Sequence, residues 1–101
     1  MAKKKIRVAL IGCGGNMRGA HVPRLQNDGA VELVSVADTS EEQAQALMDR
    51  WGSEVPHYTD YRKMIKREKI DAIMISSPHS MHYEQARFAM KNDLHVLVEK
   101  P

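Results

Sequence analysis

Several features that would mark other classes of protein are missing from this chain of 101 residues. It has one cysteine, Cys13, so an internal disulfide is excluded, as is usual in reducing compartments. No apolar run approaches the ~20 residues that cross a bilayer. The apolar stretch of residues 8–11 is also too short for the core of a signal peptide. We therefore expect a cytoplasmic protein with no membrane association.

An excess of charge of either sign is missing too. Fifteen Lys and Arg residues against thirteen Asp and Glu residues leave a formal net charge of +2, so the composition gives no sign of a nucleic-acid partner. The basic run Lys3 to Lys5 is interpreted as a solvated entry to the first strand. With 43% hydrophobic and 28% charged residues, the chain has the composition of one globular domain.

What is present is an alternation of strand-like and helix-like segments. Short, branched apolar runs at 6–11, 31–37, 70–75 and 95–98 predict buried strands, and residues 57–59 predict a short edge strand. Helical patterns separate them, which implies right-handed crossovers between parallel strands. We expect an α/β fold, a doubly wound parallel sheet of the Rossmann-like type with strand order 3-2-1-4-5. The fifth strand would lie at an edge, with the chain ending before the C-terminal part of the sheet.

The helices carry start and stop signals of different clarity. Ser40 and Gln43 have capping-box spacing, and Gly52 ends a stripe of apolar residues. That stripe consists of Ala44, Leu47, Met48 and Trp51. Pro23 predicts that the first helix starts late or kinks near Val22.

Two further helices are predicted in the second half of the chain. Asp60 is placed to cap a helix that carries an apolar face. That face consists of Tyr61, Met64 and Ile65. A last helix over about 77–92 is expected to bury Tyr83, Ala86 and Met90.

A glycine-rich turn follows the first strand. Gly12 and Gly14 allow a tight turn that brings backbone close to a pyrophosphate at the start of the next helix. In the pattern Gly-x-Gly-x-x-Gly, however, the third position is Met17, and Gly19 comes two residues later. On this evidence a dinucleotide site and a plain strand-to-helix turn are equally supported.

Asp38 favours the dinucleotide site. It ends the second strand, where a carboxylate accepts hydrogen bonds from the hydroxyls of an adenosine ribose. The alternative role is to cap the following helix. Thr39 and Ser40 are neutral, with no arginine placed to hold a 2′-phosphate, so NAD is predicted over NADP.

Residues 76–82 follow the fourth strand, at the point where ligands of open α/β sheets collect. Ser77 and Pro78 also fit an ordinary helix start, which needs no ligand. His79 and His82 lack an acidic or cysteine partner at a suitable spacing, so no metal site is predicted. The other histidines, His57 and His95 among them, are interpreted as structural or surface residues.

Taken together, these motifs resemble a known family. The chain has Gly12-Cys13-Gly14-Gly15 followed by His21, Asp38 after the second strand, Ser77-Pro78 with His82, and a closing strand that ends in Glu99-Lys100-Pro101. This combination resembles the N-terminal domain of the Gfo/Idh/MocA oxidoreductases, the glucose-fructose oxidoreductase and inositol dehydrogenase group. The resemblance covers essentially the whole chain.

The resemblance implies roles for individual residues, with Lys100 as the catalytic residue near the nicotinamide and the reacting carbon. It implies that Asp38 holds the adenosine ribose, and that His82 lies near the ribose or nicotinamide. The cofactor-binding set it implies is Gly12, Gly14, Gly15, Asn16, Met17, Asp38, Ser77, Pro78, His82, Glu99 and Lys100. Two departures from the family pattern are a glycine loop one residue longer and His79 where asparagine is common.

The resemblance also implies a function for the parent protein. Such an enzyme transfers a hydride between a nicotinamide cofactor and a secondary alcohol of a sugar, polyol or related compound. We expect residues 1–101 to form its dinucleotide-binding domain, with a C-terminal substrate domain outside this chain. Alone, the chain is expected to bind NAD weakly or not at all and to lack activity. Its last strand, residues 94–98, is an apolar edge at which two copies could pair into a homo-oligomer.

Other functions stay open at this point. The chain could be a non-catalytic nucleotide-sensing domain or an α/β interaction module, because a fold does not fix a function. A phospho-acceptor receiver domain fits poorly, since the first strand ends in glycines and not in the acidic cluster that such a domain needs.

Overall fold

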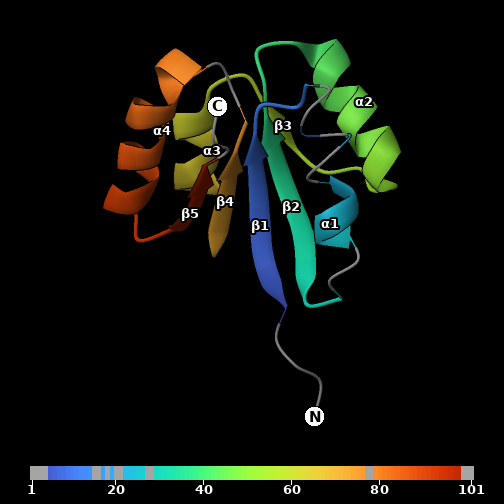
Figure 1. The fold of residues 1–101 in the computed structure, drawn as a ribbon, viewed down its shortest axis with the longest axis horizontal. Helices are drawn as coiled ribbons and strands as arrows, with labels where there is room; N and C mark the ends of the chain where they lie inside the picture. The colour runs from blue at the N-terminus through green and yellow to red at the C-terminus, as the bar shows by residue number, and fades with distance from the viewer. Residues whose placement is uncertain are drawn as a thin grey trace.

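A computed structural model describes residues 5–14, 17, 19, 22–26, 29–76 and 79–98. Five strands and four helices alternate along this part of the chain (Figure 1). The strands are β1 (Ile6–Ile11), β2 (Val31–Ala37), β3 (His57–Tyr58), β4 (Ala72–Ile75) and β5 (His95–Val98). The helices are α1 (Val22–Gln26), α2 (Glu41–Trp51), α3 (Tyr61–Arg67) and α4 (His79–Lys91).

The strands form one sheet in the order β3-β2-β1-β4-β5, and all four pairs are parallel. This confirms the predicted fold class and strand order. Helices α1 and α2 cover one face of the sheet, and α3 and α4 cover the other (Figure 1). After β3, at one edge of the sheet, the chain crosses to the other face and returns to the middle as β4, beside β1. The switch point of the sheet therefore lies between β1 and β4.

Each face of the sheet has its own hydrophobic core, because alternate residues of a strand point to opposite faces. Val8 and Leu10 of β1 pack with Leu47 on the α1 and α2 side. Ala9 and Ile11 pack with Met64 on the α3 and α4 side. Burying each larger side chain stabilises the fold by about 1.5–3 kcal/mol before entropy is counted.

One irregularity in β2 changes which residues face each core. Val8 pairs with Leu33, but the next residue, Ala9, pairs with Ser35. The extra residue is a β-bulge, which shifts the alternation by one position. As a result Leu33 and Val36 both lie in the core on the α1 and α2 side.

The first two helices follow the sequence signals, with one difference. Helix α1 begins at Val22, one residue before Pro23, and Met17 and Gly19 ahead of it are π-helical; the sequence predicted a first helix that starts late or kinks near Val22. Helix α2 ends at Gly52, whose φ of 88° favours glycine and whose N–H donates to the carbonyl of Met48. At its start, Ser40 Oγ accepts from the backbone N–H of Gln43 at 3.2 Å. In a full capping box the side chain of Gln43 would accept from Ser40 N–H. Here Ser40 N–H donates to Asp38 Oδ1 instead, at 2.7 Å.

Helix α3 is joined to the edge strand by a side-chain hydrogen bond. Asp60 caps the helix as predicted, by accepting from the N–H of Arg62. At the other end, the Tyr58 hydroxyl donates to Glu68 Oε2 at 2.6 Å. This hydrogen bond, together with burial and the negative charge of Glu68, raises the pKa of Tyr58 above its usual value of 10.0.

The raised pKa of Tyr58 makes the stability of the fold depend on alkaline pH. Because the folded state holds the phenol proton more tightly than the unfolded chain, this contribution is complete below pH 10.0 and is lost as pH rises through the folded-state pKa. We expect Tyr58→Phe to make the decline in the free energy of unfolding above pH 10.0 less steep. Chemical denaturation along a pH series measures this pH dependence of the free energy of unfolding. Tyr83→Phe is the control, because Tyr83 is exposed. Identical slopes for wild type and Tyr58→Phe would contradict the assignment.

The buried face of α4 differs from the expected one. Tyr83 and Met90 were predicted to be buried, but they are 77% and 59% exposed. Gln85 and Ala89 occupy the buried face instead, with exposures of 3% and 0%, while Ala86 is partly buried as expected. The helix has apolar residues all round it, so its sequence does not determine which side meets the sheet.

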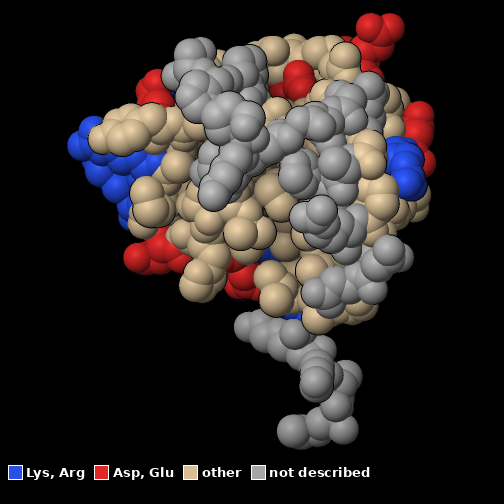
Figure 2. Space-filling model, viewed as in Figure 1, with Lys and Arg blue, Asp and Glu red and all other residues tan. Residues whose placement is uncertain are grey.

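Charged side chains lie mostly at the periphery. In Figure 2 acidic and basic groups are found close to one another around the rim of the visible face, and neither sign forms a broad patch there. None of the helices in the described part of the chain is both long and apolar enough to cross a bilayer.

Candidate functional site

Four strands end next to one another at the carboxyl edge of the sheet. Gly12 follows β1, Asp38 follows β2, Thr59 follows β3 and Ser76 follows β4. These four residues line one cavity of about 330 Å³. It lies at the carboxyl edge, where open α/β sheets bind their ligands.

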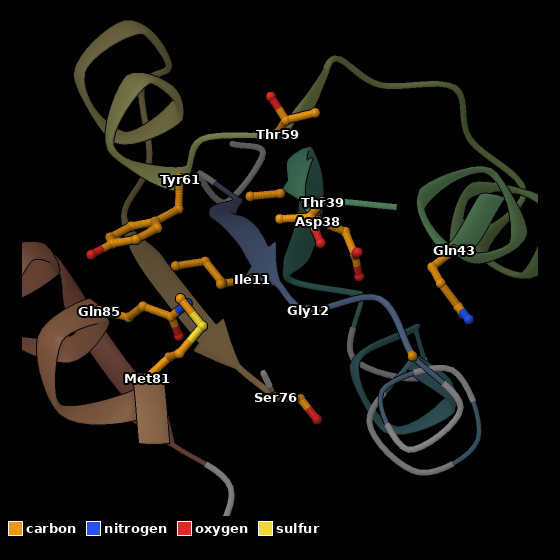
Figure 3. Close-up of a pocket in the computed structure, with 12 residues that line it drawn as sticks. Ile11, Gly12, Asp38, Thr39, Gln43, Thr59, Tyr61, Ser76, Met81 and Gln85 are labelled. Atoms are coloured by element: carbon orange, nitrogen blue, oxygen red, sulfur yellow. The ribbon is translucent and has the colours of Figure 1, made fainter. Parts of the chain in front are cut away.

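The cavity has an apolar side and a polar side (Figure 3). Ile11, Tyr61 and Met81 make up the apolar side, between β1, α3 and α4. Asp38 and Thr39 lie across from them, at the end of β2. A ligand with a flat apolar part and a hydroxylated part would match both sides.

The glycines leave one wall of the cavity as bare backbone. Gly12 has a φ of 89°, a conformation that residues with a side chain rarely adopt. Its N–H donates to the carbonyl of Ala37 at 2.8 Å, which ties the turn to the end of β2. Nothing lies within 4 Å of the position where a Cβ on Gly14 would be. A ligand can therefore approach the backbone closely at Gly14.

The Asp38 carboxylate is held on both of its oxygens. Cys13 N–H donates to Oδ2 at 2.8 Å, and Ser40 N–H donates to Oδ1 at 2.7 Å. An ionised carboxylate has about four acceptor positions, so each oxygen keeps one for a ligand hydroxyl. The carboxylate thus joins the glycine turn to the start of α2 and retains the capacity to bind a diol.

Two polar atoms in the cavity wall lack a hydrogen-bond partner among the described residues. They are Gln43 Oε1 and the Tyr61 hydroxyl oxygen, and both are buried. Such atoms are costly to leave unpaired. The fit of the cavity to a nucleotide rests on the Asp38 carboxylate and on the open backbone at Gly14.

Of the predicted site residues that the structure describes, Gly12, Gly14 and Asp38 line the cavity. The Met17 side chain is fully buried in the core on the α1 and α2 side, so only its backbone can meet a ligand. His82 is half-buried on α4 and does not line this cavity. The remaining predicted residues, Gly15, Asn16, Ser77, Pro78, Glu99 and Lys100, lie outside the described residues.

Several lining residues were missed by sequence reasoning. Thr59 and Tyr61 follow the edge strand β3, and Met81 and Gln85 lie on α4. The predicted strand order contained one usable signal, because it places the end of β3 beside Asp38. The contribution of Met81 and Gln85 depends on the rotation of α4, which the sequence did not reveal.

Within the described ranges, no group of three or more His, Cys, Asp or Glu side chains is arranged to hold a metal ion.

Comparisons with known proteins identify relatives of the chain. Residues 6–101 match the family model GFO_IDH_MocA, an oxidoreductase family with an NAD-binding Rossmann fold. The chain is 34% identical over its whole length to D-glucoside 3-dehydrogenase of Escherichia coli (strain K12), of which it spans 28%.

Solved structures agree with this match. The chain resembles a myo-inositol 2-dehydrogenase from Lactobacillus plantarum with a TM-score of 0.84 and 37% identity, covering 97% of this chain and 29% of that one. A 3-ketoreductase from Actinomadura kijaniata, solved with TDP-benzene and NADP, matches with a TM-score of 0.84 and 28% identity over 97% of this chain and 30% of that one. The chain therefore spans less than a third of the length of these relatives. With its parallel sheet, its glycine turn and a family match over residues 6–101, the chain belongs to the Gfo/Idh/MocA oxidoreductase family as an NAD(P)-binding Rossmann domain.

Proposed function

We propose that this chain is the dinucleotide-binding domain of a dehydrogenase that acts on a secondary alcohol of a sugar or polyol. The observation that carries the proposal is the Asp38 carboxylate, which faces the cavity beside the Gly12 turn with acceptor capacity left on both oxygens. The named activities of the relatives, on a glucoside and on inositol, support the substrate class.

The residues of the domain bind and orient the cofactor. Backbone at Gly12 and Gly14 would approach the pyrophosphate, and Asp38 would accept hydrogen bonds from both adenosine ribose hydroxyls. The nicotinamide dinucleotide, when bound, supplies a ring carbon that exchanges a hydride with the substrate. Lys100 would place an ammonium near the substrate hydroxyl, where it stabilises developing alkoxide charge. A substrate domain, in the part of the parent protein beyond this chain, would add the main acid and base groups.

NAD is the proposed cofactor, in preference to NADP. A ribose bound at Asp38 would bring a 2′-phosphate beside the carboxylate, and two negative charges repel strongly where water is partly excluded. Thr39 and Ser40, which follow it, carry no charge to offset that repulsion. The 3-ketoreductase was solved with NADP, so membership of the family leaves the choice to the residues of each chain.

A titration with both dinucleotides tests this proposal. We expect the parent protein to bind NAD at least about tenfold more tightly than NADP, equivalent to ~1.4 kcal/mol. Isothermal calorimetry measures both affinities, and the absorbance of NADH reports oxidation of inositols and sugars by the parent protein. Tighter binding of NADP would overturn the cofactor assignment. Binding of neither dinucleotide by the parent protein would overturn the function.

A further inference from the structure

His57 is in contact with Asp38 from the neighbouring strand. Its ring nitrogen Nε2 lies 2.8 Å from the backbone carbonyl oxygen of Asp38. Because a carbonyl only accepts, Nε2 must carry the hydrogen and donate it. Strand β3 is only two residues long, and its last pair joins Tyr58 to Ala37. The imidazole thus adds a side-chain contact to Asp38, beside the backbone hydrogen bond from Asp38 N–H to the carbonyl of Tyr58.

With this bond, every polar group of Asp38 has a partner. Its N–H donates to the carbonyl of Tyr58 at 3.0 Å, and its carboxylate accepts from Cys13 and Ser40. Those three partners are backbone groups, which almost any residue would supply. Among the described residues, His57 provides the one partner of Asp38 that depends on the identity of a side chain.

His57 acts from outside the ligand cavity. It does not line the cavity that contains Asp38, but a second one of about 470 Å³. That second cavity shares Thr39 and Thr59 with the first. The ring therefore lines the neighbouring cavity and contacts Asp38 at its backbone carbonyl.

We propose that His57 is a positioning residue for the adenosine ribose site. By holding the Asp38 peptide, the imidazole fixes the direction in which the carboxylate leaves β2, and so its alignment with the two ribose hydroxyls. Hydrogen bonds to a charged acceptor depend steeply on that alignment. The inference rests on the proposed function, because it requires that a ribose binds at Asp38.

The test compares two replacements of His57 with two ligands. His57→Phe keeps a ring but removes the donor, whereas the side-chain amide of His57→Gln can place an N–H near the position of Nε2. The ligands are NAD and an NAD analogue that lacks both hydroxyls of the adenosine ribose. We expect His57→Phe to weaken NAD binding about threefold to tenfold, to leave the analogue nearly unaffected, and His57→Gln to recover most of the loss.

Controls separate positioning from a general loss of structure. His95→Phe, the same change at an exposed histidine of β5, should leave NAD affinity unchanged. In an Asp38→Ala background, His57→Phe should have no further effect on NAD. If His57→Phe fails to fold, His57→Asn, whose amide is too short to reach, takes its place.

Two results would overturn the inference. An equal loss of NAD and analogue binding in His57→Phe would indicate a purely structural role, and unchanged NAD binding would indicate no role. Failure of the proposed function looks different, because the wild-type parent protein would then bind neither NAD nor the analogue. Failure of the ribose assignment alone would show as equal binding of NAD and the analogue by the wild type.

Discussion

Replacing Asp38 with alanine is expected to weaken NAD binding by about a hundredfold, or ~2.7 kcal/mol. Hydrogen bonds to a charged group contribute about 1.5–3 kcal/mol each, and the carboxylate would accept one from each ribose hydroxyl. The change also leaves Cys13 N–H and Ser40 N–H without their acceptor, so the glycine turn loses its link to α2. Calorimetric titration with NAD gives the affinity directly.

The same variant should lose its preference between cofactors. Because alanine removes the charge that repels a 2′-phosphate, NADP binding should stay constant or improve while NAD binding falls. Asp38→Asn keeps one acceptor oxygen, so its affinity for NAD should lie between those of the wild type and Asp38→Ala. Asp49→Ala is the matched control, since Asp49 is exposed on α2 and does not line the cavity. An NAD affinity for Asp38→Ala within twofold of wild type would refute the ribose assignment.

The largest expected loss of stability follows from Leu10→Ala. Leu10 lies on the central strand β1, is 0% exposed and packs in the core on the α1 and α2 side. Removing a buried leucine side chain costs about 2–5 kcal/mol, because the cavity that remains is only partly filled by its neighbours. In a domain of this size each kcal/mol lowers Tm by roughly 4–8 °C. Calorimetry should therefore record a fall in Tm of about 10 °C or more.

Leu97 provides a matched control on the same sheet. It lies on the edge strand β5 and is 55% exposed, so Leu97→Ala should cost about 1 kcal/mol or less. Similar losses for the two variants would mean that β1 is not the centre of the sheet. If Leu10→Ala does not fold, Val8→Ala in the same core is expected to show a smaller loss.

Much of the fold could be predicted because its signals are local. The apolar run of β1 ends at glycines, α2 begins with Ser40 and ends at Gly52, and Asp60 caps α3. Each signal acts within a few residues, so neighbouring sequence is enough to recognise it. Alternation of strands and helices then limits the sheet to few arrangements.

The remaining features depend on contacts between distant segments. The bulge in β2 arises from its pairing with β1, and no local motif marks it. Packing against the sheet determines which side of α4 is buried: Ala89 and Gln85 face the sheet, and Tyr83 is exposed. For the site, Gly12, Gly14 and Asp38 were predictable as strand-end motifs.

The bond between His57 and Asp38 joins residues 19 positions apart, and only the pairing of β2 with β3 brings them together. A surface or structural histidine was the interpretation available from sequence. The hydrogen bond now assigns it a specific partner in the candidate site.

In the proposed function, the Asp38 cavity holds the adenosine ribose of a nicotinamide dinucleotide. An NMR titration of the isotope-labelled protein with NAD tests it most directly, because amide shifts also report weak binding. We expect the amide signals of Cys13 and Ser40, which donate to the Asp38 carboxylate, and of Gly14 to move together and saturate. Shifts confined to other parts of the chain, with these three amides unmoved, would contradict it.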